Sequence, residues 1–318
     1  MGATNGQFGT FNNVAFTGTN LTNGTVSGTS TATGTNTLTN TTNIGAFSIN
    51  SGTTTLAGTT TNTSGTITSA GGTTMVTGTV NGGTMNVTGG TLNVASGANA
   101  NALLFQETSG VVTLNGGMSV STAELLGGTF DGTGSFSADT VNNGNSASNG
   151  INYDVNGSAA AWGGTATIGT VNVGSYNQTA GGAISINFNG GFTSNDELDA
   201  TTAVGLNGTL NLLTATGGEL NTASLKTNQA YVLIDLGGGH DVTGQFSTVN
   251  AIGIVGTASV TAGTTSGWWL VYNGSHGDGD VELDFVGPTS SAPEPGTDIL
   301  LGGALIGLTL LRKKLARR

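Results

Sequence analysis

Short segments in which apolar residues alternate with threonine or asparagine recur along this chain, and glycine bounds most of them. The clearest pair is Thr84-Met85-Asn86-Val87 and Thr91-Leu92-Asn93-Val94, which lie seven residues apart. Apolar residues at every second position are the pattern of a β-strand with one buried face. We therefore predict short strands joined by glycine turns, with the apolar side chains of these two units pointing into a core.

Similar units follow at residues 111–117, 127–132, 166–173 and 183–188. They leave no room for the crossover helices of a doubly wound α/β fold. Many very short strands with recurring Thr-x-Asn favour a parallel β-helix over a sandwich, because each turn of a β-helix buries side chains and stacks on the next. The predicted fold class is all-β: a right-handed parallel β-helix (β-solenoid) with one hydrophobic helix at the C-terminus.

The character of the segments changes along the chain and divides it into five parts. Residues 1–70 are rich in Thr, Asn and Gly and are predicted to form either thin rungs or a partly ordered extension. Residues 71–200 are predicted to form the β-solenoid. Longer, more apolar and more aromatic segments in 201–287 indicate its C-terminal cap, with a separate small domain as the alternative. A proline-containing linker at 288–298 precedes a hydrophobic helix and basic tail at 299–318.

Charge and cysteine content exclude several functions. The net charge is −11, and of the six basic residues only Lys226 lies outside the last seven positions. A body with so little positive charge cannot neutralise phosphates, so no nucleic-acid partner is expected. The chain has no cysteine, which removes disulfides, thiolate metal sites and cysteine nucleophiles.

The C-terminal residues carry the most specific motif. Pro293-Glu294-Pro295 is followed by an apolar run and then by a basic tail. The apolar side chains of the run are Ile299, Leu300, Leu301, Leu305, Ile306, Leu308, Leu310 and Leu311. The basic side chains are Arg312, Lys313, Lys314, Arg317 and Arg318.

This arrangement resembles the PEP-CTERM sorting signal, which implies processing by an exosortase-type enzyme after transient anchoring in the inner membrane. Residues 299–311 span roughly 20 Å as a helix, short of a hydrocarbon core of ~30 Å, and flanking Lys and Arg side chains can make up part of the difference. Positive charge after the run holds that end in the cytoplasm and leaves residues 1–292 outside. A buried core helix is the alternative interpretation of the run.

A second resemblance covers residues 231–285, with Tyr231-Val-Leu-Ile-Asp, Gly244-Gln-Phe246 and Trp269-Leu-Val-Tyr272. It is similar to the segment that ends autotransporter-type β-helical passenger repeats. Export requires a signal peptide, yet Met1 to Phe16 has neither a basic nor an apolar region of that kind. The exported form is therefore expected to carry a different N-terminus.

Candidate reactive residues are few. His240 and His276 lie in glycine-rich segments and are interpreted as polar turn residues. Asp278 and Asp280 are interpreted as a tight turn rather than a calcium site. The group of Asp196, Glu197 and Asp199 is predicted to be a solvated loop, with a glycosidase-like carboxylate pair as the alternative. No catalytic residue, metal or cofactor is predicted.

We therefore predict a secreted or surface-attached structural or matrix protein that is not an enzyme. Adhesion and binding of extracellular polysaccharide remain open in this hypothesis. The alternatives are a polysaccharide-active β-helix enzyme, or a glycan- or ice-binding module built on aligned threonines.

Overall fold

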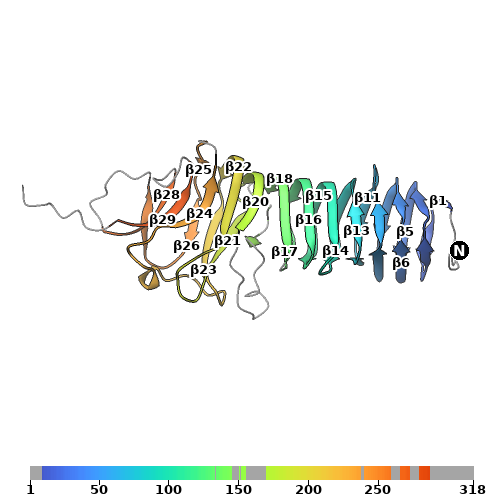
Figure 1. The fold of residues 1–318 in the computed structure, drawn as a ribbon, viewed down its shortest axis with the longest axis horizontal. Coiled ribbons are helices and arrows are strands. Elements are labelled where there is room, and N and C mark those ends of the chain that lie inside the picture. Colours follow the sequence, from blue (N-terminus) through green and yellow to red (C-terminus); the bar gives the residue numbers. More distant parts are fainter. Residues whose placement is uncertain are drawn as a thin grey trace, which may run out of the picture.

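The computed structural model shows an all-β solenoid whose turns stack along the long axis of the molecule (Figure 1). The structure describes residues 9–286 except 133, 145–149, 151, 155–169, 238–239, 259–265 and 273–278. Among the described residues, the helical element is one short 3-10 helix, η2 (Thr222–Ser224). The predicted all-β solenoid is confirmed, whereas the predicted C-terminal helix lies outside the described residues.

Three short strands, one on each face, make up each N-terminal turn. The first face holds β1 (Thr10–Asn12), β4 (Thr25–Ser27), β7 (Thr42–Asn43), β10 (Thr59–Thr61) and β13 (Thr79–Asn81). The second holds β2 (Ala15–Thr17), β5 (Thr29–Thr33), β8 (Ala46–Ile49) and β11 (Thr66–Ser69). The third holds β3 (Asn20–Thr22), β6 (Thr35–Thr39), β9 (Thr53–Ala57) and β12 (Thr73–Val76). Each strand pairs in parallel with the strand above it, so residues 10–76 belong to the solenoid.

Further along the chain, single strands run around the corners and cover two or three faces. These are β14 (Thr84–Val94), β15 (Asn99–Leu114), β16 (Gly117–Leu125), β18 (Ser135–Asn143), β20 (Thr170–Gln178) and β22 (Glu197–Leu206). The strand β17 (Thr129–Asp131) pairs with the end of β15 on the third face. A separate parallel sheet contains β19 (Asn152–Asp154), β21 (Ala183–Phe188), β23 (Thr209–Thr214) and β26 (Thr248–Asn250).

The two repeat units at residues 84–94 belong to one strand, which corrects the prediction of two strands. Met85 stacks between Ile67 and Phe105 on the second face, while Leu92 stacks on Val112 on the third. The seven-residue offset therefore relates neighbouring faces of one turn, and not neighbouring turns. Met85, Leu92 and the two valines of this strand are buried, as the alternation predicts.

Part of the interior changes from polar to apolar along the axis. One inward column on the third face runs Asn36, Thr54, Thr74, Leu92, Val112 and Phe130. The early turns are narrow enough for polar side chains to reach partners: Asn36 accepts from the Thr19 amide at 2.9 Å, and Asn43 donates to Asn62 at 2.8 Å. Later turns bury larger apolar side chains, and Phe130 packs edge-on against Phe105 and Phe136.

One corner of the solenoid is built from stacked glycines. They are Gly34, Gly52, Gly72, Gly90, Gly110 and Gly128, one in each of six successive turns. A Cβ on Gly90 would lie 2.3 Å from the carbonyl oxygen of Gly72, closer than real Cβ contacts allow. The turns approach one another through backbone alone at this corner, which explains why glycine recurs there.

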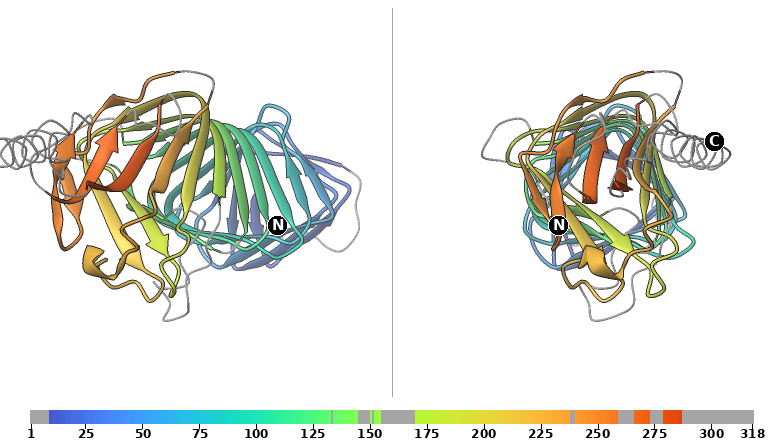
Figure 2. Two further views of the ribbon diagram at one scale, coloured as in Figure 1. Left: turned by 60° about the vertical axis from the view of Figure 1, so that its left-hand side comes forward. Right: turned by 90° about the vertical axis from the view of Figure 1, so that its left-hand side faces the viewer.

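The solenoid ends in a mixed cap (Figure 2). The cap contains β24 (Tyr231–Leu236), β25 (Thr243–Gly244), β27 (Ile254–Ala258), β28 (Gly267–Tyr272) and β29 (Val281–Val286). The strand β24 continues the parallel stack on β22, but β29 pairs antiparallel with both β24 and β28. Trp268 packs against Tyr231 and Phe285, so large aromatic side chains fill this end.

Candidate functional site

The residues of the predicted sorting signal lie outside the part of the chain that the structure describes. They are the Pro293-Glu294-Pro295 motif, the apolar run at 299–311 and the basic tail at 312–318. Within the described ranges, no helix is long and apolar enough to cross a membrane. His276 and Asp278 also lie outside these ranges, and His240 is exposed.

The outer surface of the solenoid consists of stacked columns of neutral hydroxyl and amide side chains. On the first face, Thr10, Thr25, Thr42, Thr61, Asn81, Asn101, Ser119, Ser137 and Asn172 follow one another in register. No side chain in residues 1–106 is ionisable. The surface of this N-terminal third of the chain therefore interacts through hydrogen bonds between neutral groups.

A column on the second face is joined by side-chain hydrogen bonds. Glu124, Asn142 and Asn177 lie in register on successive turns, followed by Gly205 and Thr243. Asn142 donates to the Glu124 carboxylate at 2.8 Å, and Asn177 donates to the side-chain oxygen of Asn142 at 3.2 Å. The column lacks a side chain at Gly205, so its hydrogen-bonded chain ends at Asn177.

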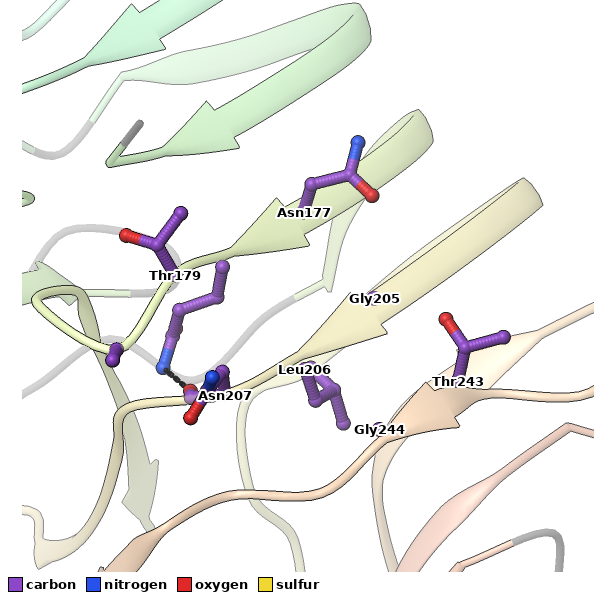
Figure 3. Close-up of a pocket in the computed structure, with 9 residues that line it drawn as sticks. Asn177, Thr179, Gly205, Leu206, Asn207, Thr243 and Gly244 are labelled. Atoms are coloured by element: carbon purple, nitrogen blue, oxygen red, sulfur yellow. Dashed lines mark hydrogen bonds between the residues drawn. The ribbon is translucent and has the colours of Figure 1, made fainter. Parts of the chain in front are cut away.

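A pocket of about 500 Å³ lies beside this interruption (Figure 3). Asn177 and Thr243 lie on either side of Gly205 in the close-up, and Leu206 and Asn207 continue the wall. The lining side chains are all uncharged: Asn177, Gln178, Thr179, Ala180, Leu206, Asn207 and Thr243, with Gly205 and Gly244. Gln178 is buried and donates to the Asn207 carbonyl at 2.6 Å, which fixes that side of the pocket.

A second polar feature is a carboxylate cluster in the cap. Asp280 and Glu282 are only 3% and 1% exposed, and Asp280 is hydrogen-bonded to the side chains of both Asp235 and Glu282. Two carboxyl groups can share a hydrogen bond only through a proton. In addition, Asp235 stacks on Asp199 of the preceding turn, so the first-face column of neutral side chains ends in carboxylates.

Burial and mutual repulsion shift the ionisation of this cluster. Burial raises the pKa of Asp280 to about 7, with further increases from the charges of Asp235 and Glu282 and from its hydrogen bonds to them. The pKa of Glu197 is raised by burial first and then by Asp235 and Asp199. Burial and the charge of Asp235 also raise the pKa of Asp199. Asp280 therefore keeps its proton up to nearly neutral pH.

The structure corrects the prediction of a solvated acidic loop. Asp196 is fully buried and accepts from the backbone and side-chain nitrogens of Asn187, each at 3.0 Å. Glu197 and Asp199 lie in β22. The sequence signal that could have shown this is the alternation of buried and outward residues, which begins at Asp196 and continues through Glu197 and Asp199 into β22. Asp280 precedes β29 and is buried, which the interpretation as a turn residue did not anticipate.

Among the described residues, no group of three or more His, Cys, Asp or Glu side chains is arranged to hold a metal ion. Fold and surface together define a β-solenoid with a mostly neutral polar exterior and an acidic cap. No protein-family model, curated protein or solved structure matches the chain.

Proposed function

We propose that this chain is a secreted or surface-attached structural protein of the extracellular matrix, sorted by its C-terminal PEP-CTERM-like signal. The solenoid acts as a spacer and as a neutral hydrogen-bonding surface, and it has no enzymatic role. An exosortase-type enzyme processes the chain while residues 299–311 anchor it in the inner membrane. We further propose right-handed winding, since nearly all parallel crossover connections within a sheet have that hand.

The observation that supports this proposal most is the continuous register of neutral outward side chains along the stacked turns. Such a surface can hydrogen-bond to hydroxyl-rich polymers without ion pairing. It offers no positive charge to bind phosphates or uronates. The buried carboxylates argue against the enzyme alternative. Asp280 is hydrogen-bonded to Glu282 inside the cap. The pocket at Gly205 has no carboxylate in its lining. A glycosidase needs two carboxyl groups flanking the scissile bond.

The sorting step is the part to test first. We expect the mature protein recovered from the cell surface to lack Arg312–Arg318 in intact-mass spectra. Replacing Pro293-Glu294-Pro295 by alanines should keep the full-length chain in the membrane fraction. Pro288→Ala is the matched control, because it removes a proline from the same linker and leaves the motif in place. A mature wild-type chain that still carries the basic tail would overturn the sorting proposal.

A further inference from the structure

We propose that the pocket at Gly205 is a binding site for a neutral saccharide, held by two oxygen acceptors that flank the missing side chain. This assignment rests on the proposed function and names the ligand class that the matrix protein would contact. It places recognition at one position of the second-face column, rather than along the whole polar surface.

The hydrogen-bonded column has a defined donor-to-acceptor direction. The Glu124 carboxylate can only accept, so the Asn142 side chain must turn its NH₂ group toward it. The oxygen of Asn142 then faces the next turn and accepts from the NH₂ group of Asn177. The direction is thereby set for the whole column, and the side-chain oxygen of Asn177 faces Gly205.

Gly205 leaves one position of this column without a side chain. A Cβ built on Gly205 would lie 3.0 Å from Oδ1 of Asn177 and 3.6 Å from Oγ1 of Thr243. Where the two preceding turns carry asparagine, this turn has no side chain between two oxygens, and the Asn177 oxygen lies closer to the empty position than an ordinary contact with a Cβ would allow. Gly205 does not adopt a left-handed φ, so its conformation does not require glycine. Glycine here opens a pocket, in contrast to the corner glycines that relieve a backbone contact.

The hydrogen-bonding groups beside Gly205 define the class of ligand. The Thr243 hydroxyl donates to the Val204 carbonyl at 3.0 Å, which leaves its oxygen as an acceptor. The side-chain oxygens of Asn177 and Thr243 can therefore both accept hydrogen bonds from donor groups of the ligand. Adjacent hydroxyl groups of a sugar supply two such donors, and Leu206 contributes apolar surface to the same pocket. An anionic ligand is disfavoured, because the site presents acceptors and the chain carries a net charge of −11.

The test uses the purified full-length chain and three neutral probes: cellohexaose, maltohexaose and chitohexaose. We expect at least one of them to bind in calorimetry and to shift the side-chain NH₂ signals of Asn177 in NMR spectra. An oligogalacturonate of the same length should not bind. Gly205→Asn fills the vacancy with the residue of the preceding turns, and we expect a loss of affinity of roughly 10-fold or more.

Two matched controls separate pocket filling from general effects. Gly117→Ser adds a side chain at another glycine of an outward column, on the first face between Asn99 and Ser135, where a Cβ would lie 2.6 Å from Asn99 Oδ1 and the Asn99 side chain must shift. Asn101→Ala removes an asparagine from another ladder, in which it donates to Asn81 at 2.9 Å. Both should bind the probe like the wild type. Asn177→Ala keeps the pocket open but removes an acceptor, so it tests the site even if Gly205→Asn fails to fold.

Three outcomes would overturn the proposal: no binding of any neutral probe, unchanged binding by both Gly205→Asn and Asn177→Ala, or an equal loss in the two controls. None of these bears on the sorting step, because the assay uses purified protein. Conversely, an uncleaved tail on the surface protein would overturn the proposed sorting and leave the saccharide measurement intact.

Discussion

Glu107 is a fully buried carboxyl group in β15 whose oxygens form no hydrogen bond of normal geometry. Burial raises its pKa from 4.5 to about 8, and the nearby backbone of Thr129 opposes this only in part. The folded chain therefore keeps Glu107 neutral over a pH range in which the unfolded chain ionises it. The associated stability is complete below about pH 4.5 and is lost progressively as the pH rises toward 8.

We predict that Glu107→Gln raises the free energy of unfolding by a few kcal/mol near pH 8 and changes it little below pH 4.5. The amide resembles the neutral acid and does not ionise. Urea unfolding at several pH values measures the difference, and Glu219→Gln is the control at an exposed carboxylate. A pH-independent effect of Glu107→Gln would show that Glu107 is ionised in the folded chain.

Gly90 represents the stacked glycine corner. Because its added Cβ would meet the Gly72 carbonyl oxygen at 2.3 Å, Gly90→Ala must push two turns apart. We expect a loss of about 1–3 kcal/mol, typical of overpacking at a site that cannot relax. Gly190→Ala should be nearly neutral, because no atom lies within 4 Å of the Cβ built there. Equal effects in urea unfolding would mean that the corner is not a tight backbone contact.

At the scale of elements, the antiparallel strand β29 is joined to β24 partly through carboxyl groups that share protons. The raised pKa of Asp280, about 7 against an ordinary 3.8, makes this contact strongest in acid. Stability from the protonated form is fully present below about pH 3.8 and declines as the pH rises through 7. The contact between β29 and β24 should therefore lose stability as the pH rises through 7.

We predict that Asp280→Asn stabilises the cap at pH values above 7 and flattens its pH dependence, because an amide keeps a donor without charge. Trp268 lies between Tyr231 and Phe285, so its fluorescence reports on this region. Measuring in a Trp162→Phe background removes the signal of a tryptophan outside the described residues. Persistence of the wild-type pH transition in Asp280→Asn would assign the titration to another group.

The positions of the strands could be predicted from the sequence more readily than the way in which the strands stack on one another. Alternation identified Met85 and Leu92 as inward, because a strand period is local. The turn of the solenoid to which each residue belongs is determined by the number of residues at the corners, and this number varies. Sequence spacing therefore did not show that one strand carries both Met85 and Leu92. The same difficulty hid the pocket: Asn142, Asn177 and Gly205 stack in register although the segments between them differ in length. Cross-turn contacts of this kind become visible only in three dimensions.

At the scale of the whole molecule, the solenoid has a gradient of interior polarity. Buried polar side chains are concentrated in the early turns and include Ser30, Asn36, Thr41, Thr54, Thr60 and Thr74. Later turns enclose apolar side chains such as Phe105, Val112, Leu125 and Val141. In a stacked repeat structure each turn contacts mainly its neighbours, so local stability follows local core content. The N-terminal turns should open more readily than the middle ones.

We predict that backbone amides of β1 to β9 exchange with deuterium faster than those of β15 to β22, as measured by mass spectrometry under native conditions. Thr54→Val tests the cause. The Thr54 hydroxyl is fully buried without a hydrogen-bond partner, so valine should add about 1 kcal/mol or more and slow exchange in β6, β9 and β12. Thr60→Val is the control, because that hydroxyl contacts Thr41 at 3.5 Å and its removal gives less benefit. Uniform exchange along the wild-type solenoid would contradict the gradient, and faster exchange in Thr54→Val would show that polar interior groups stabilise the narrow turns.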